Sequence, residues 1–529
     1  MNGVFVFFVV VVAVFHGVKS KPVVEEDAQA FRFANIYGDH MVLQKAPNHA
    51  VVWGFGEVGQ QVKVELSGKV YETQITPGPQ GAGVWRVTLD VQKAGGPFTI
   101  TASSIVNSTV QNANLKDVYF GDIWVCSGQS NMQFSVSQAV NLTEAAKEAD
   151  NYPEIRLFTA YQVQSDTPLY ELSVVQQPWS VASSASVNGG AWKYFSAVCW
   201  FFAKNLYDRY KYPLGMIATD WGGTAIEVWS SSDALATCNI TEEALQHQER
   251  FLAPEEEIFA PTPSKPSVLY NAMIHPLLNM TIYGAIWYQG EANAYAPDTY
   301  NCTFPAMIDD WRQKWYDGTD GYTDPQFPFG FVQLSSYGTD PKFIGGFPVI
   351  RWAQTANYGY VPNSRMGNVF MAVSMDLGNA SSPWGSIHPN DKQDVGYRLA
   401  LSGRAIAYSD PVYHTGPLPV RVSANYSPME GWMVDVLYTE VGQDGIDIRS
   451  RNGFEYYCES PSAATWVDAQ IISSSFYKVS LFGMCPAGTG DVAGIRYAWR
   501  QDPCPFKGCA VYSKAEGLPA GPFVKYAPF

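Results

Sequence analysis

The chain has 529 residues, of which 47% are hydrophobic, 14% aromatic and only 16% charged. This composition excludes an intrinsically disordered chain, and the length corresponds to about two to four domains. The formal net charge of −15 opposes binding to a polyanion, so nucleic acid is not an expected partner.

The chain begins with an unbroken apolar run from Val4 to Phe15, followed by small and polar residues up to Ser20. The run is shorter than the ~20 residues that a membrane-spanning helix needs, and its position is typical of a secretory signal peptide. No basic residue precedes it, and a buried N-terminal strand is the alternative interpretation. We predict a signal peptide at residues 1–20.

Sequons and cysteines also indicate the secretory route, either extracellular or lysosomal. The Asn-x-Ser/Thr sequons, which we predict to be glycosylated, are Asn107, Asn141, Asn239, Asn279, Asn301, Asn379 and Asn425. Of the 8 cysteines, only Cys504 and Cys509 are close enough in sequence to suggest a pairing. No cysteine or histidine cluster has zinc-site spacing, so no metal is expected, and no later segment is apolar enough to span a membrane.

Residues 31–115 alternate short β-type runs with turn clusters, which predicts an N-terminal β-sandwich-like domain. The runs are Ala50–Gly54, Val62–Leu66 and Phe98–Ala102, and Pro77–Gly81 supplies a loop between two of them.

Residues 116–408 alternate apolar strand candidates with helical stretches, which predicts an α/β domain with an open, mainly parallel sheet flanked by helices. The strand candidates are Val118–Cys126, Pro213–Ala218, Thr281–Tyr288, Phe329–Leu334 and Val369–Met375. The helix candidates are Ala197–Tyr210, Phe304–Trp315 and Asn390–Ile406. Residues 239–266 read as a surface insertion, helical at Glu242–Phe251, and residues 409–529 return to β patterning, as expected of a C-terminal β module.

Reactive side chains gather at the carboxyl ends of strands in such sheets, so each strand end is a candidate for the site. The first ends in Gly128-Gln129-Ser130-Asn131, which places a serine on a tight turn into a helix N-terminus, where free N–H groups can hold an oxyanion. The next end, Trp221-Gly222-Gly223, lets main-chain N–H groups approach a ligand closely. The third, Gln289-Gly290-Glu291-Ala292-Asn293, offers an amide donor.

Apart from His247, which lies in the surface insertion, only two histidines, His275 and His388, fall within the α/β region. His275 has apolar neighbours typical of a core histidine, whereas His388 lies in a strand-to-helix loop. We therefore favour His388 as the general base. Each motif also has a purely structural interpretation, such as a capped turn at Ser130 or a tight bend at Gly222, and their order along the chain is what favours a site.

The motifs Gly-Gln-Ser130-Asn-Met, Trp221-Gly-Gly, Trp-Tyr-Gln289-Gly-Glu-Ala-Asn and His388-Pro, in this order, resemble the sialic acid O-acetylesterase family of SGNH-type carbohydrate esterases. The resemblance covers Asp117 to Ala407. It implies an SGNH-hydrolase-like fold with flanking β modules, a serine esterase activity and no cofactor.

The resemblance also implies residue roles. Ser130 would be the nucleophile and His388 its base. The oxyanion hole would be formed by the N–H of Ser130, the N–H of Gly222 or Gly223, and the side chain of Gln289. The side chains expected to contact substrate or support the site are Asn293, Glu291 and Trp221.

The third member of a triad is left open by the sequence. Relatives carry an aspartate shortly before the histidine, where this chain has Gly385 and Ser386. We favour Asp376, at the end of a predicted strand, over Asp391, which the macrodipole of the following helix already explains. A Ser-His dyad oriented by a main-chain carbonyl is an equal alternative.

The expected reaction is hydrolysis of O-acetyl esters of sialic acids or sialoglycans, with the 9-O-acetyl group favoured, to free sialic acid and acetate through an acetyl-enzyme. The alternatives are an acetyl esterase for plant or microbial polysaccharide and a non-catalytic carbohydrate-binding protein. The substrate follows from fold analogy and the chemistry from the residues.

Overall fold

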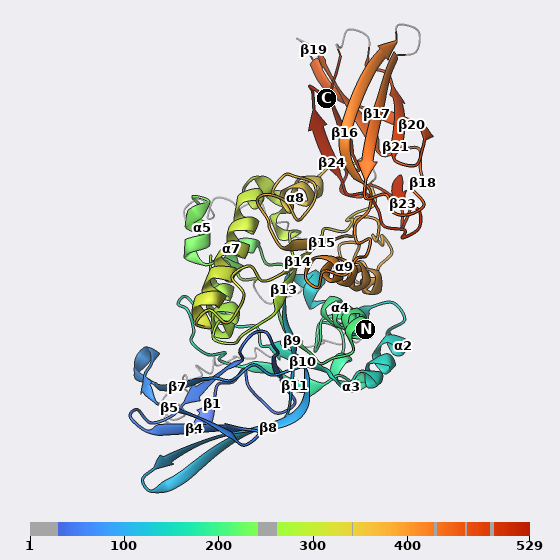
Figure 1. Cartoon of the computed structure of the whole chain (residues 1–529). Coiled ribbons are helices and arrows are strands. Elements are labelled where there is room, and N and C mark those ends of the chain that lie inside the picture. The colour runs from blue at the N-terminus through green and yellow to red at the C-terminus, as the bar shows by residue number, and fades with distance from the viewer. Residues whose placement is uncertain (1–29, 242–261, 341, 428–430, 461–462, 487–490) are drawn as a thin grey trace, which may run out of the picture.

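The computed structural model describes residues 30–241, 262–340, 342–427, 431–460, 463–486 and 491–529. The N-terminal strands lie at one end of the molecule, the C-terminal strands at the other, and the helices lie between them (Figure 1). The predicted signal peptide and the predicted helix at Glu242–Phe251 lie outside the described residues. Among the described residues, no helix is long and apolar enough to cross a membrane.

The N-terminal region is built from short strands, as its sequence pattern predicts. One sheet has the order β1-β3-β7-β6, formed by Arg32–Phe33, Val51–Phe55, Gly83–Thr88 and Thr76–Pro77. The other strands of this region are β2 (Val42–Gln44), β4 (Gln61–Leu66), β5 (Lys69–Gln74) and β8 (Gly95–Val106). In β4 the apolar residues are buried and the polar ones exposed, which is the alternation of a strand with one face on the core.

Strand β9 (Thr109–Gly128) joins the N-terminal region to the α/β region without interruption. Its first part pairs with β8 in an antiparallel hairpin, and its last residues pair with two strands of the α/β region. The boundary expected at residue 115 therefore falls inside one strand. Because β9 links both parts, the resulting 11-stranded sheet is mixed rather than mainly parallel as a whole.

The α/β part of this sheet has the strand order β11-β10-β12-β9-β13-β14-β15. The strands other than β9 are Val175–Val181, Ile155–Ala160, Leu214–Asp220, Gly284–Tyr288, Phe329–Gln333 and Val369–Val373. All neighbours from β10 to β15 are parallel, and β11 pairs antiparallel with β10. The predicted strands are present, whereas β10 and β11 were not predicted. The carboxyl ends of the parallel strands meet at one edge, where a site is expected.

Helices cover both sides of this sheet, with α5 and α7 on one side and α4 and α9 on the other (Figure 1). The larger helices are α4 (Ala197–Tyr210), α7 (Tyr300–Gly318), α8 (Phe347–Ala353) and α9 (Lys392–Ile406). The short ones are α1 (Ser130–Gln133), α2 (Leu142–Glu148), α3 (Ser184–Val187) and α5 (Ser232–Thr237). Helix α9 packs on α4 and β15 because Val395, Leu399 and Ala400 turn an apolar face inward.

Single turns of helix fill the connections. The 3₁₀ turns are Pro79–Gly81, Val136–Gln138, Ala149–Asn151, Ile226–Trp229, His275–Leu277, Ala292–Tyr295 and Pro297–Thr299, and Tyr270–Ile274 is a π-helical turn.

After Tyr408, the described residues form strands and no helices. A sheet of order β16-β17-β21-β20-β19-β22-β24 is formed by Leu418–Ser427, Gly431–Thr439, Lys478–Gly483, Ala463–Ser474, Phe454–Ser460, Val492–Tyr497 and Phe523–Tyr526. A small ribbon pairs β18 (Ile446–Ile448) with β23 (Val511–Ser513).

The cysteines form four disulfides: Cys126–Cys199, Cys238–Cys302, Cys458–Cys485 and Cys504–Cys509. The last confirms the one pairing that sequence proximity suggests. The first joins β9 to α4 close to the expected nucleophile, so Cys126 is a half-cystine rather than a reactive thiol.

Candidate active site

The turn between β9 and α1 carries Ser130 at the carboxyl edge of the sheet. Gly128 has a φ of +142°, and a Cβ added there would collide with the main-chain carbonyl of Tyr288, so only glycine fits. Gln129 then binds the turn to the end of β13: its N–H donates to the carbonyl of Tyr288 (3.0 Å), and its side-chain oxygen accepts from the N–H of Gly290 (3.3 Å). Ser130 therefore follows a fixed turn as the first residue of α1.

The predicted nucleophile and base are brought together. His388 Nε2 lies 2.8 Å from Ser130 Oγ, and His388 Nδ1 lies 2.8 Å from the main-chain carbonyl oxygen of Trp384. A carbonyl can only accept, so Nδ1 carries the proton and Nε2 is left free to accept the proton of the serine hydroxyl. This is the tautomer that a general base requires.

The surroundings of His388 keep its imidazole neutral. Burial lowers its pKa from 6.5 to about 4, the Trp384 carbonyl acts in the opposite direction, and the positive charge of Lys392 lowers the pKa further. His275 lies apart from this pair. Its Nδ1 contacts the carbonyl of Leu169 at 2.8 Å, which agrees with the expected core histidine.

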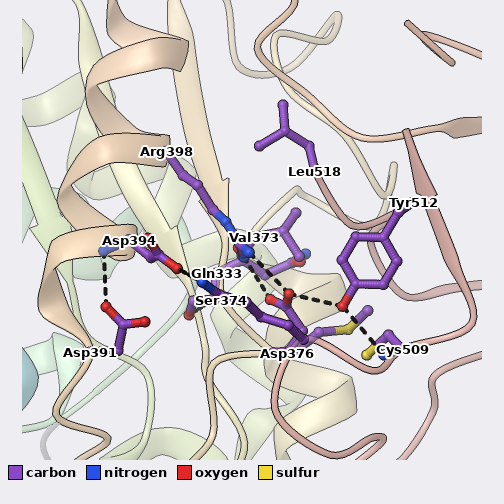
Figure 2. Close-up of polar contacts among 12 residues, drawn as sticks. Gln333, Val373, Ser374, Asp376, Asp391, Asp394, Arg398, Cys509, Tyr512 and Leu518 are labelled. Carbon is purple, nitrogen blue, oxygen red and sulfur yellow. Dashed lines mark hydrogen bonds and ion pairs between the residues drawn. The ribbon is translucent and has the colours of Figure 1, made fainter. Parts of the chain in front are cut away.

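Asp376, the favoured acid, is engaged elsewhere (Figure 2). Its fully buried carboxylate accepts hydrogen bonds from both terminal nitrogens of Arg398 (2.6 and 3.0 Å) and from the hydroxyl of Tyr512 (2.9 Å). The imidazole of His388 is oriented by Trp384 instead. The expectation that Asp376 orients the base is therefore corrected, because Asp376 serves a buried ion pair with α9.

Asp391 caps α9, as the sequence suggests. Its carboxylate accepts the main-chain N–H of Asp394 at 3.1 Å, which satisfies one of the free donors at the helix start (Figure 2). Asp394 itself pairs with Lys507. These contacts account for both aspartates without a role in proton transfer.

Gly222 lies directly against the nucleophile. A Cβ added to Gly222 would be 3.2 Å from the Cβ of Ser130, so a side chain there would crowd the serine. The N–H of Gly222 donates to the side-chain oxygen of Gln133 at 2.8 Å. Gly223 follows with a φ of +74°. Ser130 is the first residue of α1, so the main-chain N–H of Ser130 has no acceptor within the helix.

Gln289, the third expected oxyanion donor, has both of its amide hydrogens occupied. Its nitrogen donates to the carbonyl of Thr224 (3.1 Å) and to the side-chain oxygen of Asn293 (2.7 Å), and its oxygen accepts from Tyr300 (2.9 Å). The carbonyl partner fixes which end of the amide carries nitrogen. Gln289 is fully buried, so its expected role as an oxyanion donor is corrected to a support for the site.

Two of the expected substrate-contacting side chains are also buried supports. Asn293 donates to both oxygens of Glu227 (3.1 and 3.0 Å) and accepts from the N–H of Ile226 (2.9 Å). Glu291 accepts from Asn131, the neighbour of the nucleophile, at 2.6 Å. The contacts of both side chains hold the loops around the site, although Oε2 of Glu291 is buried without a hydrogen-bond partner among the described residues.

The aromatic residues at the strand ends differ in exposure. Trp221 is half-buried beside Gly222, so its expected place at the edge of a sugar site is compatible with the structure. Trp287 and Tyr288, at the end of β13, are fully buried in the core and cannot form walls of a sugar site.

An aromatic group around the base is a feature that sequence reasoning missed. The ring of Trp192 lies 5.1 Å from the imidazole of His388, and Trp384 and Phe134 lie next to Trp192. Gln138 binds both tryptophans. Its side-chain oxygen accepts a hydrogen bond from the main-chain N–H of Trp192 (2.9 Å), and its main-chain carbonyl accepts one from the indole N–H of Trp384 (3.1 Å). Trp192 has a φ of +60°, which is uncommon for a bulky residue. Its position in an aperiodic loop gives no sequence signal.

The expected glycosylation sites differ in accessibility. Asn107, Asn141, Asn239 and Asn425 are exposed. Asn279, Asn301 and Asn379 are half-buried, and the amide nitrogen of Asn379 donates to Asn390 at 2.9 Å.

Comparisons with known proteins agree with this geometry. Residues 120–381 match the family described as carbohydrate esterase, sialic acid-specific acetylesterase, and residues 427–527 match the sialate O-acetylesterase C-terminal domain. The crystal structure of XAC1771, a carbohydrate acetylesterase from Xanthomonas citri, is similar with a TM-score of 0.74 and 26% identity, over 94% of this chain and 99% of that one.

Full-length relatives extend the likeness over nearly the whole chain. The sialate O-acetylesterase of Mus musculus is 41% identical over 518 residues, which cover 93% of this chain and 94% of the relative. The Homo sapiens protein of the same name is 41% identical over 500 residues, which cover 94% and 92%. With the serine and histidine motifs joined in one site, this chain belongs to the sialate O-acetylesterase family.

Proposed function

We propose that this chain hydrolyses O-acetyl esters of sialic acids, the 9-O-acetyl ester above all, to free sialic acid and acetate. The observation that carries the proposal is the contact of Ser130 Oγ with His388 Nε2 at 2.8 Å, with the other ring nitrogen held by a carbonyl. The names of the full-length relatives supply the substrate class.

In the first half of the reaction, Ser130 Oγ attacks the acetyl carbonyl carbon and His388 Nε2 takes the hydroxyl proton. The tetrahedral intermediate collapses as the bond to the sugar oxygen breaks, and the imidazolium gives its proton to that oxygen. The sugar leaves with a free hydroxyl, and the acetyl group remains on the serine.

In the second half, water attacks the acetyl-enzyme and gives its proton to His388 Nε2. The bond between the acetyl carbon and Ser130 Oγ breaks as the imidazolium returns the proton to Oγ, and the acetic acid that leaves ionises to acetate in solvent. The chain functions here as a Ser-His dyad in which the carbonyl of Trp384 holds the imidazole. The N–H groups of Ser130 and Gly223 serve as the oxyanion donors, because the N–H of Gly222 is held by Gln133.

The direct test is Ser130→Ala, assayed with a chromogenic acetyl ester and with 9-O-acetylated sialic acid. We expect a loss of at least about 10³-fold in kcat and loss of labelling by a fluorophosphonate probe. A variant that folds and retains wild-type turnover would contradict the proposed mechanism.

A second candidate substrate class is acetylated polysaccharide. The likeness to XAC1771, a carbohydrate acetylesterase from Xanthomonas citri, favours it. Rates with acetylated xylan and with acetylated sialic acid, measured on one preparation, separate the two. A higher kcat/KM for xylan would overturn the sialic acid assignment.

Location and domain division belong to the same proposal. The protein follows the secretory route to the extracellular space or the lysosome, supported by four disulfides, which persist in oxidising compartments. Two measurements on the protein from eukaryotic cells test this. Its N-terminus should follow the predicted signal peptide, and its mass should fall on treatment with a glycosidase that removes N-linked glycans.

The proposed domains are residues 31–115, 116–408 and 409–529, although β9 passes through the first boundary.

A further inference from the structure

A buried lysine, Lys392, follows His388 by four residues and contacts Asn131, the residue after Ser130. Lys392 is the first residue of α9 and has no exposed surface. Burial disfavours an ammonium ion, and so does the positive end of a helix. Both effects oppose the charge at this position, so stability alone does not explain the residue. Burial lowers the pKa of Lys392 from 10.5 to about 7, and the nearby carboxylates of Glu291 and Asp391 act in the opposite direction.

The contacts of Lys392 lead to the nucleophile turn. Its ammonium donates to the side-chain oxygen of Asn131 at 2.6 Å. It also lies 4.7 Å from the ring centre of Phe134 and 5.3 Å from that of Tyr288, where aromatic faces attract a cation. Asn131 directly follows the nucleophile, Ser130, in the chain.

The Asn131 amide joins the two halves of the catalytic pair. Its nitrogen donates to the carboxylate of Glu291 (2.6 Å) and to the main-chain carbonyl of Ile387 (2.9 Å), the residue before His388. Protonated Lys392 can only donate, so it fixes the oxygen of the amide toward itself and both hydrogens toward the other partners. One amide, oriented by the lysine, therefore links the residue after the serine to the residue before the histidine.

The charged groups around the base have opposite effects. Lys392 opposes protonation of His388, whereas Glu291 and Asp391 act on Lys392 and support its charge. The Nδ1 atom of His388 faces the neutral carbonyl of Trp384 rather than a carboxylate that would favour the imidazolium.

We propose that Lys392 is a positioning residue of the esterase reaction, which orients the Asn131 amide between the nucleophile turn and the histidine loop and adds a positive charge that opposes protonation of His388. This inference rests on the proposed function, because it concerns the same dyad. Its consequence is an acid limb of activity that lies at lower pH than burial of His388 alone would give, since the base must be neutral to accept the serine proton.

The test compares Lys392→Met with Lys392→Gln in the full chain. Glutamine can still donate to Asn131 but carries no charge, whereas methionine loses both properties. For Lys392→Met we expect kcat to fall about 10- to 100-fold through misplacement of the pair, with a much smaller change in KM because the lysine does not touch substrate. For both variants we expect the acid limb of the kcat/KM profile to move to higher pH, because a charge that opposes protonation of His388 is gone.

A double-variant cycle shows whether Lys392 acts through Asn131. We expect Lys392→Met to cost little further in kcat once Asn131→Ala is present, because the amide that it orients is gone. Lys507→Met is the matched control: it removes a cation that pairs with Asp394 of the same helix at the surface, and it should leave kcat and the acid limb unchanged.

The outcomes separate this inference from the proposed function. Unchanged kcat and pH profile in Lys392→Met, or fully additive effects with Asn131→Ala, would overturn the role of Lys392 while Ser130→Ala remains inactive. An active Ser130→Ala protein would instead overturn the proposed function. If Lys392→Met does not fold, the pH profile of Lys392→Gln decides: an unmoved acid limb overturns the inference, and a limb at higher pH supports it.

Discussion

The imidazole of His388 is held by the main-chain carbonyl of Trp384, at 2.8 Å from Nδ1, and not by a side-chain carboxylate. A carbonyl fixes the tautomer as a carboxylate would, but it brings no negative charge to stabilise the imidazolium. The base is therefore well oriented and weakly basic. The predictions below follow from this geometry.

Asp376→Asn should affect stability more than catalysis. The substitution leaves the buried guanidinium of Arg398 without its counter-ion, which costs about 3–5 kcal/mol in the free energy of unfolding. We expect kcat of the folded protein to stay within about threefold of wild type, because Asp376 does not orient the base. Denaturant unfolding and steady-state kinetics on one preparation check both parts.

Asp391→Asn is the matched control, because asparagine caps a helix nearly as well as aspartate and little change in stability is expected. A drop of orders of magnitude in kcat for either folded variant would restore a carboxylate to the mechanism.

Gly222→Ala should reduce kcat rather than raise KM. The added methyl group would lie 3.2 Å from the Cβ of Ser130, so it would displace the serine or the groups around its acyl adduct. Losses of about 10²-fold are typical when an oxyanion site is disturbed. Gly367→Ala is a suitable control, since a Cβ there meets no atom within 4 Å. Equal kcat for the two variants would show that Gly222 does not shape the site.

His388 should make folding stability depend on pH. Its pKa is lowered to about 4 in the folded protein from 6.5, so the unfolded state binds the proton more readily. The contribution of His388 to the free energy of unfolding is complete above pH 6.5. As the pH falls toward 4, it decreases by up to about 3 kcal/mol. The difference in unfolding free energy between wild type and His388→Asn, measured across this range, isolates this residue from the other histidines. A constant difference would contradict the lowered pKa.

Trp192→Ala should move the acid limb of kcat/KM to higher pH. The indole of Trp192 lies 5.1 Å from the imidazole, and its removal lets water reach a ring whose pKa is lowered mainly by burial. The pKa of His388 then rises toward its ordinary value. Tyr194→Ala, in the same loop but exposed, serves as the control. An acid limb that coincides for the two variants would remove Trp192 from the environment of the base.

The sequence by itself predicted the pairing of Ser130 with His388 and much of the sheet. Ser130 and His388 were found because each lies at a strand end or helix start that short-range hydrophobic patterns reveal, and the helix predicted at Ala197–Tyr210 has these bounds in the structure. Strand β10, the edge strand β11 and the continuity of β9 were missed, because neighbours in space, not periodicity, decide where a strand ends.

Only the tertiary structure decided which groups support the pair. Every residue has a carbonyl, so no sequence signal marks the one at Trp384, and its place depends on the fold of the loop before His388. Asp376 has the right residue type for a triad, but Arg398 and the distant Tyr512 bind it. In the sequence Lys392 resembles any surface lysine, but in the structure it is buried against Asn131, and a low-dielectric interior screens its charge far less than water does.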